Sequence, residues 1–246
     1  MIDHKDAHLP KADVVGFDDF LEDLFGLNIR GLKTLWISFR SPRSYYKAAT
    51  SPNWLGLFTP SFRLFLSLLA IIFLMQFFWG NINSPAVTSY AAQMEAQNIP
   101  LPDGISYRQA GYTFSNWYAA FIPPFTILFY LIIGSFYGVW GRKLSFVERQ
   151  RYLFISVVPD TFISIFLITL LGVIPHERII QFLLLFPLIS FFITAQIAYR
   201  GAYLKDSRWS KLWRAGLLAI IIVITAQLAS FSAQYAAAKV IQFKYI

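Results

Sequence analysis

The chain has 246 residues and a formal net charge of +8, and it contains no cysteine. Hydrophobic residues make up 57% of it and charged residues 14%, whereas soluble domains average about 45–50% and about 25%. The composition excludes disulfides, thiolate metal sites and cysteine nucleophiles, and it predicts an all-α, polytopic membrane protein. The three histidines lie at the start of the chain and in one short loop, so we predict neither a metal site nor a cofactor.

Residues 1–60 are predicted to form a cytoplasmic amphipathic leader, whose first half is acidic. Four apolar residues recur there at helical spacing, opposite acidic side chains: Phe17, Phe20, Leu21 and Leu24. Anionic lipid repels an acidic helix face. We therefore expect this helix to pack on protein, either the chain's own cytoplasmic loops or a membrane-protein partner.

The second half of the leader is basic. Residues 28–47 are apolar at helical spacing and carry five basic side chains, which are Arg30, Lys33, Arg40, Arg43 and Lys47. A basic amphipathic helix suits the cytoplasmic surface of a membrane. We therefore predict that these five residues lie at the membrane surface and that membrane lipids are partners of the protein.

The remainder of the chain, residues 61–246, contains five long apolar stretches. A hydrocarbon core about 30 Å thick needs about 20 apolar residues in a helix. The stretches that approach this length cover approximately residues 62–79, 117–140, 152–174, 179–199 and 215–235. The sequence therefore predicts a five-helix transmembrane bundle.

The basic residues predict the orientation of this bundle. Alternate connections hold 17 and 4 of the Lys and Arg residues, and the richer side is cytoplasmic in membrane proteins. We predict a protein of the inner (cytoplasmic) membrane with a cytoplasmic N-terminus and an external C-terminus. Because the positive charge follows topology, it does not indicate a nucleic-acid partner.

One acid, Asp160, lies inside the third apolar stretch. A carboxylate at the bilayer centre is costly, and the helical rise places polar residues of neighbouring stretches at similar depth. We expect an intramembrane polar cluster of Asp160, Thr161, Ser135, Thr194 and Gln196. Two interpretations stay open: a relay or binding site for a proton, cation or headgroup, and a hydrogen-bonded acid that holds a kinked helix against its neighbours.

Three of the five apolar stretches contain internal prolines, namely Pro123 and Pro124, Pro159, and Pro187. An internal proline removes a backbone hydrogen bond, so we predict helix kinks at these positions. The tandem pair is also expected to open a cavity beside its helix.

The segment TLWISFRSPRSYYKAATSPNWLGLFTPSFRLFLSLLAIIF resembles the opening of an uncharacterised family of bacterial inner-membrane proteins, a domain of unknown function. The matching positions are Arg40, Pro42, Tyr46, Pro60, Arg63 and Phe65. The segment ITAQIAYRGAYLKDSRWSKLWRAGLL is similar to the family's ending. The family's Glu-His pair is replaced here by Val158-Pro159-Asp160. Five spans behind an amphipathic leader also resemble the Yip1-type membrane proteins, which implies a non-enzymatic role.

The sequence contains no nucleotide-binding glycine loop, no HExxH, no GxSxG and no paired intramembrane acids. We therefore predict no enzymatic activity. The favoured function is a membrane scaffold or accessory subunit associating with lipid or a larger membrane complex. The alternatives are a small proton- or cation-coupled transporter or channel that uses Asp160, and a lipid-modifying enzyme without these motifs.

Overall fold

The computed structural model describes residues 29–79, 81–135, 144–171, 176–203 and 207–245. Within these ranges the chain forms eight α-helices, one short 3-10 helix and no strand, which confirms the prediction of an all-α protein. The acidic segment with Phe17, Phe20, Leu21 and Leu24 lies outside the described residues.

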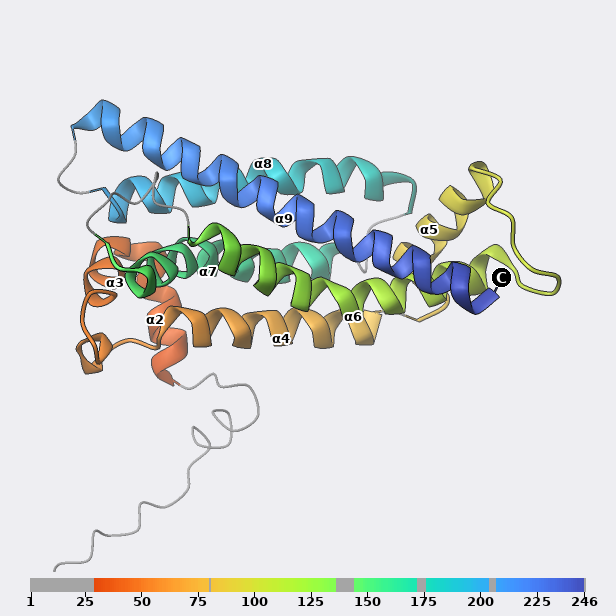
Figure 1. Ribbon diagram of the computed structural model, residues 1–246, viewed down its shortest axis with the longest axis horizontal. Helices are drawn as coiled ribbons and strands as arrows, with labels where there is room; N and C mark the ends of the chain where they lie inside the picture. The colour runs from red at the N-terminus through yellow and green to blue at the C-terminus, as the bar shows by residue number, and fades with distance from the viewer. Residues whose placement is uncertain (1–28, 80, 136–143, 172–175, 204–206, 246) are drawn as a thin grey trace, which may run out of the picture.

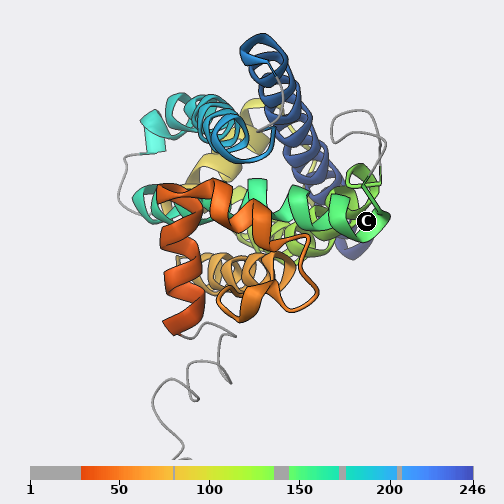
Figure 2. The same ribbon diagram turned by 90° about the vertical axis from the view of Figure 1, so that its left-hand side faces the viewer.

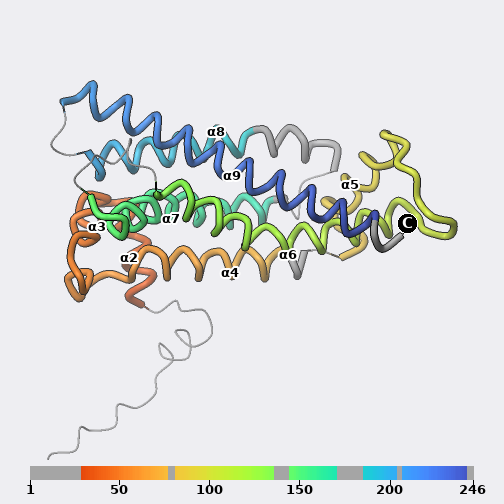
Figure 3. Tube along the Cα trace, viewed as in Figure 1, coloured from red at the N-terminus to blue at the C-terminus, as the bar shows by residue number. Residues whose placement is uncertain are grey.

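Five long helices form the body of the molecule and run roughly along its longest axis (Figures 1 and 3). They are α4 (Ser61–Trp79), α6 (Tyr107–Ile133), α7 (Phe146–Leu171), α8 (His176–Gly201) and α9 (Arg208–Tyr245). Each overlaps one of the five predicted apolar stretches.

Three of these helices are long and apolar enough to cross a membrane, counted over the described residues alone. They cover Tyr107–Ile133, Phe146–Leu170 and Arg208–Gln242, and α4 adds a shorter apolar helix over Ser61–Gln76. These helices indicate a membrane protein.

The helices extend beyond the apolar stretches where their ends have local support. Helix α6 begins at Tyr107, well before the predicted start at residue 117, because Ser106 forms a capping box with Gln109. The Ser106 backbone N–H donates to Gln109 Oε1 at 3.0 Å, and the Gln109 backbone N–H donates to Ser106 Oγ at 3.2 Å. These bonds satisfy donors that the first helical turn leaves free.

The short helices occupy the two ends of the bundle (Figure 1). Helices α2 (Ile29–Arg40) and α3 (Pro42–Ala48), with the 3-10 helix η1 (Trp54–Gly56), lie at one end. Figure 2 shows that α2 and α3 lie across the ends of the long helices. Helix α5 (Pro85–Ala96) lies at the opposite end, where α9 finishes.

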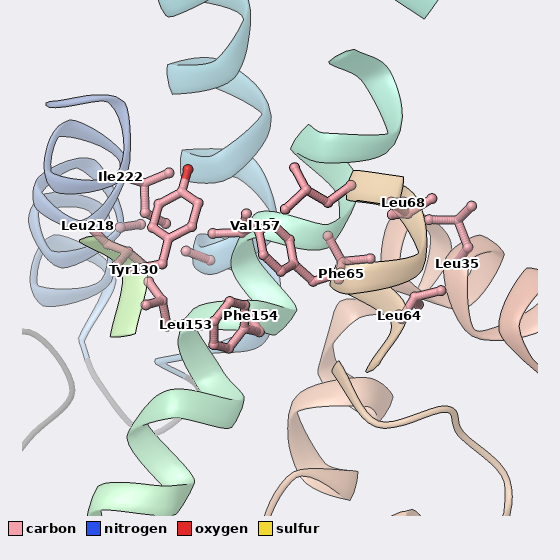
Figure 4. Packing of buried hydrophobic residues seen from close by; sticks show 14 of the residues in the cluster. Leu35, Leu64, Phe65, Leu68, Tyr130, Leu153, Phe154, Val157, Leu218 and Ile222 are labelled. Atoms are coloured by element: carbon pink, nitrogen blue, oxygen red, sulfur yellow. The ribbon is translucent and has the colours of Figure 1, made fainter. Parts of the chain in front are cut away.

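The main hydrophobic core lies toward the α2 end of the bundle and joins helices that are distant in sequence. Figure 4 shows Phe65 of α4, Tyr130 of α6 and Phe154 of α7 gathered with Leu218 and Ile222 of α9. The Phe65 and Phe154 ring centroids are 5.0 Å apart. Leu35 of α2 belongs to the same cluster, so the second half of the leader shares its core with the long helices.

Candidate functional site

Asp160 of α7 faces α8, where it has a polar partner. Ser190 Oγ donates a hydrogen bond of 2.9 Å to Asp160 Oδ2. Asp160 is partly buried, and Pro159, one residue earlier, is buried inside the same continuous helix. Asp160 is thus part of a contact between α7 and α8. Its partner Ser190 was not in the predicted cluster.

Thr194 lies one turn after Ser190 on the same face of α8, since four residues correspond to about 400° of rotation. Thr194 is fully buried, and its hydroxyl has no hydrogen-bond partner in the structure. Tyr130 of α6 lies within electrostatic range of Asp160. In Figure 4 its hydroxyl points away from Leu153 and Phe154. Polar groups from α6, α7 and α8 therefore approach one another around Asp160.

The other predicted members of the cluster have different hydrogen-bond partners or surroundings. Thr161 is buried, and its hydroxyl donates to the Val157 carbonyl at 3.0 Å within α7. Ser135 is exposed and donates to the Leu131 carbonyl at 3.0 Å. Gln196 is exposed, because six positions after Ser190 correspond to a different face of α8.

The position of Ser135 follows from how α6 and α7 pair. Gln150 Nε2 donates to the Leu131 carbonyl at 2.8 Å, so the end of α6 lies beside the start of α7. Asp160 is about 15 Å farther along α7, at the helical rise of about 1.5 Å per residue. The structure therefore separates Ser135 from Asp160.

The prolines predicted to kink the helices lie inside α6, α7 and α8, and each helix continues through its proline. Pro123 lines an apolar groove of about 350 Å³ between α4 and α6, together with Leu66, Leu69, Ala70, Phe73, Ala120 and Ile127. A groove with this lining offers no polar group for chemistry.

A second candidate site is the leader end of the bundle, which we call the platform: residues 29–60, with α2, α3 and η1. Arg151 of α7 attaches it firmly. Its Nη1 donates to the carbonyls of Ala49 and Ser51 at 2.8 and 2.9 Å, and its guanidinium lies 5.1 Å from the Trp54 ring centroid. Because these acceptors are about one hundred positions away in sequence, the contacts exist only in the folded protein.

Arg200, near the end of α8, attaches the other side of the platform. It donates to the Phe39 and Arg40 carbonyls at 2.9 and 2.7 Å, which are otherwise free at a helix C-terminus. Gly201 follows, and a Cβ there would lie 2.4 Å from the Tyr46 ring. A glycine is therefore required for α3 to approach α8 this closely.

Two buried tyrosines complete the platform. The Tyr45 hydroxyl donates to the Thr59 carbonyl at 2.9 Å, and the Tyr46 hydroxyl shares a hydrogen bond with Ser156 of α7. Burial raises the pKa of both phenols above the ordinary value. Both side chains therefore stay protonated and able to donate.

Helix α2 has two different faces. Leu35 is buried with Gly31, Thr34 and Ser38. Three other apolar side chains are exposed, and we call them the outer face of α2: Ile29 (67% exposed), Leu32 (55%) and Trp36 (64%). The five basic residues predicted to lie at the membrane surface, Arg30, Lys33, Arg40, Arg43 and Lys47, are all exposed.

A comparison of the chain with protein-family models, with curated proteins and with solved structures finds no match.

Proposed function

We propose that the protein is a non-enzymatic integral membrane scaffold or accessory subunit that associates with lipid or a larger membrane complex. The observation that carries this proposal is the platform. Arg151 and Arg200 bond it to α7 and α8, while α2 leaves Ile29, Leu32 and Trp36 exposed. A helix that is bonded to the bundle and has an exposed apolar face with basic residues around it is suited to docking rather than to chemistry.

The proposed arrangement has five spans in the inner membrane, with the N-terminus in the cytoplasm and the C-terminus outside. The distribution of basic residues between the two ends of the bundle supports it. Of the Lys and Arg residues that the structure describes, 12 lie at the platform end, and 4 lie at the opposite end, which are Arg108, Arg178, Lys239 and Lys244. This asymmetry follows the positive-inside rule if the platform is cytoplasmic.

The outer face of α2 is proposed to lie in the lipid interface beside its basic residues. A partner subunit is proposed to bind through Phe17, Phe20, Leu21 and Leu24, which precede the platform in the chain. The resemblance to the Yip1-type proteins favours the same non-enzymatic role.

The test is affinity purification of the native protein in a mild detergent, with mass spectrometry of the proteins that accompany it. We expect a stoichiometric partner that is lost in Phe20→Ser/Leu24→Ser. The matched control, Asp19→Asn/Asp23→Asn, changes the opposite face of the same predicted helix and should keep the partner. Purification without any stoichiometric protein, or with a partner that both variants retain, contradicts the accessory-subunit proposal.

A second candidate function, a small proton- or cation-coupled transporter or channel, is favoured by one observation. The buried hydroxyl of Thr194 has no hydrogen-bond partner among the residues that the structure describes, and it lies one turn from the Ser190–Asp160 bond. A ligand that bonds both groups would satisfy it.

The prediction that separates the two functions is the effect of Asp160→Asn. The amide oxygen still accepts from Ser190, so the helix contact persists and stability changes by less than about 1 kcal/mol. Flux of protons or Na⁺ into proteoliposomes should be absent in both proteins if Asp160 is structural. Flux in the wild type that Asp160→Asn abolishes, with unchanged thermal stability, supports the transporter.

A further inference from the structure

A small pocket lies at the platform end of the molecule, between the end of α8 and the start of α9. It has a volume of about 240 Å³ and is lined by Tyr199, Arg208, Trp209 and Leu212. In Figure 1 both helix ends lie at the same end of the bundle as α2 and α3. In the proposed arrangement this end lies at the cytoplasmic membrane surface.

The pocket carries positive charge. The Arg208 side chain is exposed and makes no hydrogen bond or ion pair with another residue in the described part of the chain. Lys211 lies one turn later in α9, half-buried, with its Nζ 6.0 Å from the Tyr199 ring centroid. None of the four lining residues is acidic. Arg208 thus lines the pocket, Lys211 lies beside its lining residue Tyr199, and the four lining residues present no carboxylate to an anion.

The rest of the pocket is aromatic and apolar, and it is open to the surroundings. Trp209 is 78% exposed and Leu212 is 56% exposed, values that are unfavourable in water for side chains of this size. Tryptophan and tyrosine side chains prefer the boundary between headgroups and acyl chains. The residue types thus match the place where a phospholipid changes from polar to apolar.

Exposed apolar side chains lead away from the pocket along both helices. On α9 they recur at helical spacing after Leu212, at Leu217, Ile220 and Ile224. On α8 they recur before Tyr199, at Phe192, Leu188 and Leu185. Both rows run from the platform end toward the opposite end, since α8 ends and α9 begins beside the pocket.

We propose that this pocket binds an anionic phospholipid, with the phosphate on Arg208 and Lys211 and the acyl chains along the exposed rows of α8 and α9. Guanidinium and ammonium groups are the side chains that hold phosphate in proteins, and basic pockets between membrane helices on the cytoplasmic side suit acidic headgroups. The inference rests on the proposed membrane arrangement, and it specifies the class of lipid with which the protein associates. It requires no partner subunit.

The test measures lipid retention by native mass spectrometry of the purified full-length protein. The protein is taken from nanodiscs of phosphatidylcholine mixed with phosphatidylglycerol. We expect the wild type to retain phosphatidylglycerol in preference to phosphatidylcholine. Arg208→Gln/Lys211→Gln should weaken this retention about thirtyfold, because each basic residue near the surface contributes about fivefold and the two factors multiply.

The matched control is Arg108→Gln/Lys239→Gln. It removes the same amount of positive charge at the opposite end of the bundle. There Lys239 Nζ lies 5.6 Å from the Tyr235 ring centroid, which resembles the contact of Lys211 with Tyr199. This control should retain phosphatidylglycerol like the wild type. Equal loss in both double variants would show that total charge, not the pocket, holds the lipid, and it would overturn the proposal.

A second measurement covers the case in which the Arg208 and Lys211 variant does not fold. Phosphatidylglycerol with brominated acyl chains should quench the fluorescence of Trp209, obtained as the difference between wild type and Trp209→Phe. Quenching that inorganic phosphate abolishes assigns the pocket to soluble phosphate and overturns the lipid assignment, as does equal quenching by brominated phosphatidylcholine. Neither of these two results bears on the proposed binding of a partner subunit through residues 17–24, so the two proposals are tested separately.

Discussion

The two ends of the bundle are held together by different kinds of contact. At the platform end, Arg151 and Arg200 donate to backbone carbonyls of residues far away in sequence. At the opposite end, α5 packs on α6 through close backbone approach, because a Cβ on Gly111 would lie 3.0 Å from the Val87 carbonyl oxygen. Both ends use a close approach at a glycine, Gly201 at the platform end and Gly111 at the other. Arginine-to-carbonyl bonds are more numerous at the platform end, which has four, whereas the α5 end has the bond from Arg108 Nε to the Ile82 carbonyl at 3.2 Å.

The difference follows from the surroundings of each end. A long arginine side chain reaches the carbonyls that helix ends leave free, and its aliphatic part stays against apolar surface. Close approach of two helix backbones requires a small residue such as glycine at the contact, and it suits contacts between apolar helices. We therefore expect the platform end to depend mainly on its arginine bonds, and the α5 end to depend more on the close fit of α5 against α6.

The largest expected effect in this comparison is that of Arg151→Gln. The substitution removes two hydrogen bonds from a charged donor and the contact with Trp54, which should lower the free energy of unfolding by about 3 kcal/mol. It also releases Trp54, Leu55 and Gly56, whose φ angles of 52°, 57° and 63° are left-handed. Proteolysis should become faster in residues 49–60.

The matching measurement is hydrogen exchange of the two ends in detergent. Exchange in α2 and α3 should increase, while exchange in α5 should stay as in the wild type. An equal increase at both ends would mean that Arg151 stabilises the whole bundle and that the ends do not differ in the way described.

A somewhat smaller effect is expected for Gly201→Ala. The new methyl group would lie 2.4 Å from a ring atom of Tyr46, whose side chain is fully buried and cannot move aside. Overpacking of this kind costs about 1–3 kcal/mol, seen as a lower thermal midpoint. Gly216→Ala is the control, because a Cβ at Gly216 has no neighbour within 4 Å. A lower midpoint in the control as well would point to a general effect of helix substitutions.

The smallest effect is expected at the α5 end, for Gly111→Ala. The nearest atoms to the new Cβ would be the Val87 carbonyl oxygen at 3.0 Å and the Ala91 nitrogen at 3.1 Å. A shift of α5 by a few tenths of an ångström relieves these contacts, so we expect a loss of about 1 kcal/mol. Hydrogen exchange should increase in α5 and not in α2. Faster exchange of α2 would show that the ends are coupled.

Several features of the protein follow from the sequence because they are local. Long apolar stretches predict helices of a certain length wherever they occur, so the five long helices and their order are predictable. The exposure of Arg30, Lys33, Arg40, Arg43 and Lys47 is predictable as well, since charged side chains are rarely buried without a partner. These predictions need no knowledge of neighbouring helices.

The rotation of each helix about its own axis is decided by tertiary structure. Ser190, rather than Ser135 or Gln196, meets Asp160 because α8 turns that face toward α7 and because the end of α6 pairs with Gln150. In an apolar helix every face is similar in hydropathy, so no periodicity indicates which serine faces inward. Helix α2 differs from expectation for the same reason: its apolar residues divide between a buried face with Leu35 and an exposed one with Trp36, and only contact with α3 and α7 decides between them.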